Sequence, residues 1–122
     1  MGLNRIVMRL ARNPGTEFAD GDDHRGYSVV APLTEDGKLD EHAFRAVRDA
    51  CEVRRFAPDE DPAEGKLVHR NGRWFFDYDQ DTEADEPIYR IGDHRFSVGE
   101  YVSVTDEDGR LLTYKVTEVV PA

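Results

Sequence analysis

The sequence has only one cysteine, Cys51, among its 122 residues. A single thiol cannot form an intramolecular disulfide, and it cannot supply the ligands of a multi-cysteine zinc site. Cys51 falls at the end of the helix that the sequence predicts, where the negative end of the helix dipole opposes a thiolate nucleophile. We therefore expect Cys51 to pack in the core.

Positive charge and long apolar runs are also scarce. The chain has 16 lysine and arginine residues against 26 aspartate and glutamate residues, a net charge of −10. This surplus repels a phosphate backbone, so we expect no nucleic acid partner. No stretch approaches the roughly 20 apolar residues of a membrane-spanning helix, and Arg5, Arg9 and Arg12 interrupt any signal peptide. We expect no membrane partner and a cytoplasmic location.

Recognisable catalytic and cofactor motifs are missing as well. No serine has a G-x-S-x-G sequence around it, no phosphate-binding P-loop is present, and the glycines are too scattered for a dinucleotide fingerprint. The sequence predicts no catalytic residue and no cofactor. Whether the protein is an enzyme stays open, with a non-enzymatic function favoured.

One acidic string has part of a calcium-loop pattern. Residues 77–81 alternate as D-x-D-x-D, the spacing that opens such a loop. The pattern then fails, because Thr82 replaces the glycine at position six and Ile88 replaces the glutamate at position twelve. We expect a solvated acidic loop at about residues 79–86.

The four histidines form none of the paired spacings of zinc sites. A metal or acid–base site would have to assemble in space from separate turns of the chain. The residues that such a site would use are His24, Asp93 and His94.

The first part of the chain predicts strands at 5–11, 27–33 and 53–56, from apolar alternation and β-branched residues. At 5–11 the arginines also have helical spacing, and the strand is preferred because seven residues make a marginal helix. A helix is expected over about residues 40–51. Asp40 is its N-cap, and Leu39 with Phe44 has the spacing of a hydrophobic staple.

The second part of the chain predicts mostly strands. Prolines and acids indicate a loop over 57–65, and Asn71-Gly72 predicts a tight hairpin turn between strands at 67–70 and 73–78. Its aromatic residues are Trp74, Phe75, Phe76 and Tyr78, which we expect to be mainly core rather than a binding platform. Further strands are expected at 88–91, 96–98, 101–105 and 111–119, with Gly109 in the last hairpin turn.

These elements predict an α+β, mainly β fold. We expect a twisted antiparallel sheet or a small SH3-like barrel with one packed α-helix, in a single globular domain over residues 1–122.

Several stretches together resemble a family of short, uncharacterised alphaproteobacterial proteins. They are MRLARNPG (8–15), GYSVVAPL (26–33), GKLDEHAF (37–44), VRRF (53–56), HRNGRWFFDYD (69–79) and RFSVGEYVSVTDEDG (95–109). The resemblance implies a free-standing cytoplasmic protein and supplies no reaction, ligand or catalytic residue. More loosely, residues 96–109 resemble the first hairpin of SH3-like and bromo-adjacent-type small barrels.

Complete folding signals without an assembled catalytic set favour a non-enzymatic protein-interaction or regulatory module. Its contact residues for an unidentified acidic protein partner would be Arg5, Arg9, Arg12, Arg54 and Arg55. The alternative is a small ligand- or metal-binding protein, or an enzyme, with a spatially assembled His/Asp site. The oligomeric state stays open.

Overall fold

The computed structural model describes residues 2–78, 86–89, 95–105 and 109–122. The strands are β1 (Leu3–Leu10), β2 (Asp22–Pro32), β3 (Glu52–Ala57), β4 (Glu60–Arg70), β5 (Arg73–Tyr78), β6 (Glu86–Tyr89), β7 (Tyr101–Thr105) and β8 (Leu111–Pro121). The helix α1 (Glu41–Val47) is followed by a 3₁₀ turn, Arg48–Ala50. The predicted mainly β fold with one packed helix is confirmed for the part of the chain that is described.

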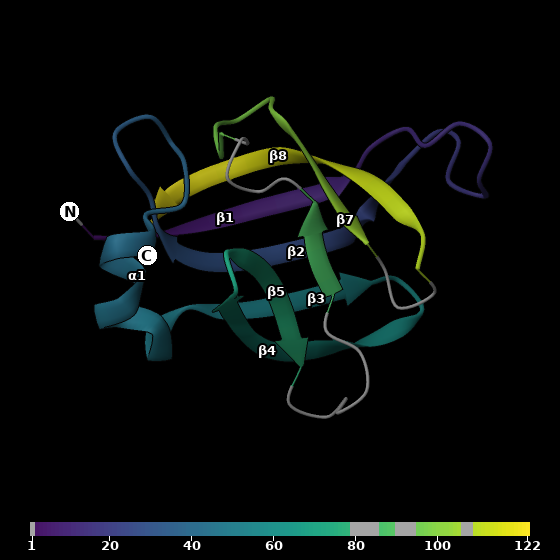
Figure 1. Cartoon of the computed structure of the whole chain (residues 1–122). Helices are drawn as coiled ribbons and strands as arrows, with labels where there is room; N and C mark the ends of the chain where they lie inside the picture. Colours follow the sequence, from purple (N-terminus) through teal and green to yellow (C-terminus); the bar gives the residue numbers. More distant parts are fainter. Residues whose placement is uncertain (1, 79–85, 90–94, 106–108) are drawn as a thin grey trace.

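The strands form one antiparallel sheet in chain order, and pairing between β1 and β8 closes it into a barrel (Figure 1). β1 pairs along most of its length with both β2 and β8. The short β6 forms two residue pairs with β5 and two with β7, so the sheet has its fewest described pairs on either side of this strand. Both termini lie at the end of the barrel that carries α1 (Figure 1).

Residues 5–11 were the ambiguous segment, and the structure shows a strand. Ile6, Met8 and Leu10 point inward and are buried, as alternation requires. The helical alternative is wrong because each backbone edge of β1 finds a partner strand, so the segment gains two hydrogen-bonded ladders instead of one marginal helix.

The predicted helix is confirmed, with its last turn tightened to 3₁₀ geometry. Asp40 is the N-cap, and its Oδ1 accepts a hydrogen bond from the Ala43 amide at 3.0 Å. Phe44 points into the core. Cys51 is fully buried, its thiol donates to the Val47 carbonyl at 3.4 Å, and burial raises its pKa to about 11. Its predicted place in the core is confirmed.

Two predictions from local composition are wrong. Residues 57–65 are almost entirely strand, because the acidic start of β4 pairs with β3 (Arg54 with Glu64, Ala57 with Glu60). Pro62 is tolerated there, since β5 pairs with β4 only from Gly65 onward.

The second wrong prediction is the strand expected at 96–98. These residues are part of a turn in which the Glu100 amide donates to the Ser97 carbonyl. Of the acidic loop at about 79–86, residues 79–85 lie outside the described residues, and Glu86 begins β6.

The hairpin at Asn71-Gly72 is confirmed, with φ of 51° and 76° at the two turn positions. Of the neighbouring aromatics, Trp74 and Phe76 are core residues as predicted, whereas Phe75 is on the outer surface, where the Arg70 guanidinium lies 5.4 Å from its ring. Gly109 has the expected positive φ of 82°.

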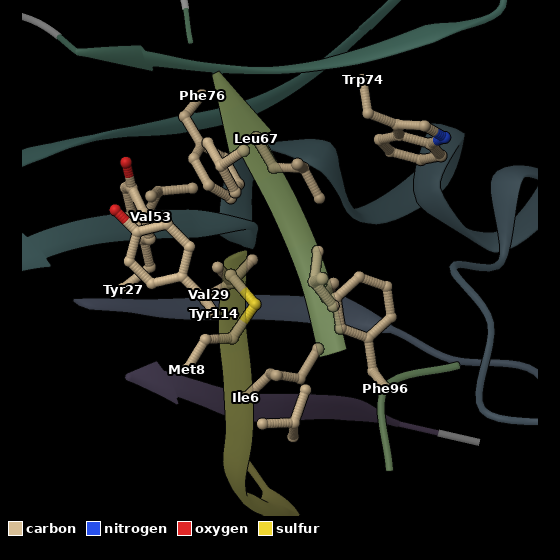
Figure 2. Close-up of a cluster of buried hydrophobic side chains, with 14 of the residues drawn as sticks. Ile6, Met8, Tyr27, Val29, Val53, Leu67, Trp74, Phe76, Phe96 and Tyr114 are labelled. Carbon is tan, nitrogen blue, oxygen red and sulfur yellow. The ribbon is translucent and has the colours of Figure 1, made fainter. Parts of the chain in front are cut away.

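Inward-facing side chains fill the barrel (Figure 2). Near α1 the filling is aromatic: Phe44 meets Trp74 edge to face at 5.0 Å, and His69 stacks on Trp74 at 4.4 Å. The helix and these rings cover that end of the barrel. The opposite end is hollowed, and it holds the site described next.

Candidate functional site: the mouth of the barrel

A cavity of about 370 Å³ lies at the end of the barrel away from α1. We call it the mouth. Its described lining is Leu10, Glu17, Phe18, Arg25, Gly26, Tyr27, Arg55, Phe56, Ala57, Asp59, Glu60, Arg110, Leu112 and Tyr114. These residues are distant in sequence but meet because, in an antiparallel barrel of this order, β1 and β3 end where β2, β4 and β8 begin.

The floor of the mouth is aromatic. The rings of Tyr27 and Tyr114 lie 5.0 Å apart at 68°, and Tyr27 also lies 4.8 Å from Phe76. Both tyrosine rings are buried, and their hydroxyl groups point to the same side, away from Trp74 and Phe96 (Figure 2). The floor therefore combines apolar ring surface with two hydroxyl groups that can donate or accept hydrogen bonds.

Three arginines, Arg25, Arg55 and Arg110, line the same cavity. Arg25 donates through Nε to Asp22 at 3.1 Å. Arg110 donates through Nη1 to both carboxylate oxygens of Glu17, each at 2.7 Å. The described lining thus carries three positive groups balanced by the three carboxylates of Glu17, Asp59 and Glu60.

Residues 11–21, which connect β1 to β2, form an ordered loop beside the mouth. Its base is anchored by Asn13, a buried polar residue whose amide donates to the Ala11 and Thr113 carbonyls at 2.8 and 3.1 Å. The Asn13 Oδ1 also accepts from the Thr113 amide at 2.9 Å. The side-chain amide thereby extends the pairing of β1 with β8 beyond Leu10. Further along, the Phe18 carbonyl accepts from the amides of Asn13 and Gly21.

Phe18 is the side chain that this loop places in the mouth. It is half-buried and packs against the core, with the Arg25 guanidinium 4.9 Å and the Arg110 guanidinium 5.8 Å from its ring centroid. The hydrogen bond from Arg110 lowers the pKa of Glu17. One loop therefore brings an aromatic ring and a carboxylate to the same two arginines.

The structure does not bring the five arginines predicted as contact residues onto one surface. Arg5 and Arg54 line a shallow depression of about 250 Å³ on the outer face. Arg9 and Arg12 line a second outer depression, of about 470 Å³. Of the five, Arg55 is the one in the mouth.

The predicted metal residues are described only in part. The His24 side chain is 75% exposed, with Nδ1 4.0 Å from Asp22 Oδ1. Asp93 and His94 lie outside the described residues, as do positions 79–81 of the acidic string. Within the described residues, no group of three His, Cys, Asp or Glu side chains is placed to hold a metal ion.

Sequence reasoning missed most of the mouth, namely Phe18, Arg25, Tyr27, Arg110 and Tyr114. One signal was available for the tyrosines. Each alternates in phase with buried neighbours, Tyr27 with Val29 and Tyr114 with Leu112, so both were identifiable as inward-facing residues. Nothing local indicates that they meet.

Comparisons with known proteins bring no further constraint: no protein-family model, no curated protein and no solved structure matches the chain. The resemblances to the alphaproteobacterial family and to SH3-like barrels stay predictions. Among the described residues, no helix has the length and apolar character to span a membrane.

Proposed function

We propose that this protein binds a small organic molecule in the mouth of its barrel. The observation that carries the proposal is the cavity itself, of about 370 Å³, with an aromatic floor and convergent polar groups. Ligand sites typically enclose about 300–1,000 Å³ and occur at the mouths of barrels; this cavity matches in volume and position and is more polar than most, with six charged residues among its fourteen described lining residues. This is the ligand-binding alternative from the sequence, built from other residues.

The packing of the barrel indicates how far such a ligand reaches. Barrels of about eight strands have an interior that side chains alone can fill. Here the interior is occupied by a continuous core that includes Met8, Val29 and Phe76. A ligand therefore rests on Tyr27 and Tyr114 at the end of the barrel and does not enter its middle.

Two neighbouring arginines provide a matched test. Arg55 lines the mouth, whereas Arg54 lines the outer depression with Arg5. Binding of a fragment library is followed by amide chemical shifts, together with the thermal midpoint of each variant. We expect saturable shifts centred on Gly26, Tyr27 and Leu112, weakened at least tenfold in Arg55→Gln and unchanged in Arg54→Gln.

The same experiment can refute the proposal. If no fragment at millimolar concentration gives saturable shifts at the mouth, the cavity is not a binding site. If Arg54→Gln weakens binding as much as Arg55→Gln at equal folded stability, the ligand binds elsewhere.

A protein-interaction function is our second proposal, supported by the outer surface around Arg9. Arg9 on β1 pairs in register with Lys115 on β8, which pairs with Tyr101 on β7. Tyr101 is 53% exposed, and Arg12 lines the same depression. We call Arg9, Arg12, Tyr101 and Lys115 the basic patch; Asp20 and Asp23 line the same depression, and Arg9 donates to the Asp23 carbonyl at 2.7 Å, so its positive charge exceeds its negative charge by one. Its chemistry suits an acidic peptide, because aromatic and guanidinium groups are both enriched at protein interfaces.

A further inference from the structure

The Arg110–Glu17 pair shows how the mouth receives a carboxylate. One nitrogen of Arg110 lies 2.7 Å from both oxygens of Glu17, although the two residues are 93 positions apart. The contact is charge-assisted, and because both side chains are partly exposed, solvent screens it. The loop thus places a carboxylate of the chain itself on a guanidinium group of the mouth.

The arginine side chains of the mouth differ in exposure from the carboxylates at its rim. The Arg25 and Arg110 side chains are 28% and 38% exposed, whereas those of Glu17 and Asp59 are 58% and 85% exposed. Asp59 and Glu60 approach Arg25 only to 4.0 Å, beyond hydrogen-bond distance. The Arg25 and Arg110 side chains are therefore less exposed than the carboxylates of Glu17, Asp59 and Glu60, while Asp22, 26% exposed, pairs with Arg25 at the same depth.

Apolar surface lies directly beside this positive charge. The Phe18 ring lies 4.9 Å from the Arg25 guanidinium and 5.8 Å from that of Arg110, and Leu10 and Leu112 line the same cavity. A ligand that satisfies both features has an anionic head and a flat, apolar body.

We infer that the mouth takes an aromatic carboxylate, whose carboxylate replaces that of Glu17 on Arg110 while its ring lies against Phe18 and the tyrosine floor. This inference rests on the proposed function and adds the ligand class to it. It does not require Arg110 to be free, because one carboxylate exchanges for another. Glu17 is then an internal competitor that occupies the anionic subsite when no ligand is bound.

The test compares phenylacetate with its neutral amide, phenylacetamide, on the full chain. Affinities are measured by titration of amide chemical shifts at low salt and pH 7. We expect the wild type to bind the acid more tightly than the amide. Glu17→Gln removes the competitor, so it should tighten acid binding about fivefold and leave amide binding unchanged.

Changes at Arg110 should have the opposite effect. Arg110→Gln should weaken acid binding at least tenfold, and Arg110→Lys, which keeps the charge without the planar guanidinium, should recover part of it. Glu35→Gln, an exposed substitution in the turn before α1, is the charge control and should change neither affinity. Thermal midpoints verify that each variant is folded.

The outcomes separate the two proposals. If acid and amide bind the mouth equally and Glu17→Gln changes neither affinity, the ligand class is wrong while ligand binding stands. If neither compound nor any library fragment shifts the mouth residues, the proposed function fails as well. If Glu35→Gln tightens acid binding as much as Glu17→Gln, net charge alone is responsible and the exchange on Arg110 is refuted.

Discussion

Replacing Asn13 with alanine tests whether the loop beside the mouth depends on a single side chain. The Asn13 side chain makes three hydrogen bonds, to the Ala11 carbonyl at 2.8 Å, the Thr113 carbonyl at 3.1 Å and the Thr113 amide at 2.9 Å. The Thr113 carbonyl keeps a second donor, the Ala11 amide at 3.0 Å. The Thr113 amide loses the partner that Asn13 provides, in a partly buried position where water cannot fully replace it.

The magnitude follows from these contacts. A neutral intramolecular hydrogen bond contributes about 1 kcal/mol net, and leaving a buried donor unpaired costs about 1–3 kcal/mol. We therefore expect Asn13→Ala to lower the free energy of unfolding by about 2–3 kcal/mol. In a chain of this length, about 4 °C of thermal midpoint is lost per kcal/mol, so the midpoint should fall by about 8–12 °C.

The assay is urea denaturation combined with amide hydrogen exchange. Exchange should accelerate at Thr113 and across residues 11–21 by more than the global loss of stability explains, because the loop opens without the rest of the barrel. Asn4→Ala is the control: Asn4 lies on β1, the strand that leads into the loop, is half-buried, and has no side-chain hydrogen bond within the described residues. A loss below about 0.5 kcal/mol for Asn13→Ala, or an equal loss for Asn4→Ala, would refute the reasoning.

Four further outcomes follow from the same structure. Gly26→Ala should cost about 3 kcal/mol or more in urea denaturation, because a Cβ there would lie 1.9 Å from a backbone carbonyl of β1. The Cys51 thiol should resist a thiol reagent until the protein unfolds, because it is buried and its pKa is raised to about 11. Arg110 lowers the Glu17 pKa from its ordinary 4.5, so the stability advantage of wild type over Glu17→Gln should be present above pH 4.5 and vanish as pH falls through the lowered pKa. A labelled hexaglutamate peptide should bind at low salt and be lost in Arg12→Glu but retained in Lys38→Glu; equal loss in both would count against the basic patch.

Local chemistry made part of the fold predictable. The Asn71-Gly72 turn requires two positive φ angles that few other residue pairs adopt, and Asp40 caps its helix with its own side chain. In such cases a few adjacent residues decide the structure. The inward alternation of Ile6, Met8 and Leu10 belongs to the same class, because a period of two admits only one buried face.

The rest of the fold depends on partners that are distant in the chain. The acidic start of β4 reads locally as a loop, yet it is a strand because β3 offers it a ladder. Barrel closure is the extreme case, since it pairs Asn4 with Pro121 and Leu10 with Tyr114. No property of either segment alone specifies that pairing.

The mouth was missed for the same reason. Arg25 and Arg110 are unremarkable in sequence, one before a predicted strand and the other after an acidic turn. They meet in the fold because Phe18, from a third segment, packs its ring near both guanidinium groups. Arg55 was named as a contact residue for its charge, but its position in the mouth follows from strand alternation, which directs it and Arg54 to different surfaces.

The net charge of −10 has to be reconciled with a cavity that is proposed to bind an anion. Summed over the chain it argues against any anionic partner, and from a distance it slows the approach of one. At the rim the same acids have a second consequence: the Glu17 carboxylate occupies the Arg110 guanidinium in an ion pair that is partly exposed to solvent. Specificity then comes from exchange, because only a carboxylate that brings its own apolar contacts improves on the one already present. An acidic surface and an anion-accepting cavity are therefore compatible in one small barrel.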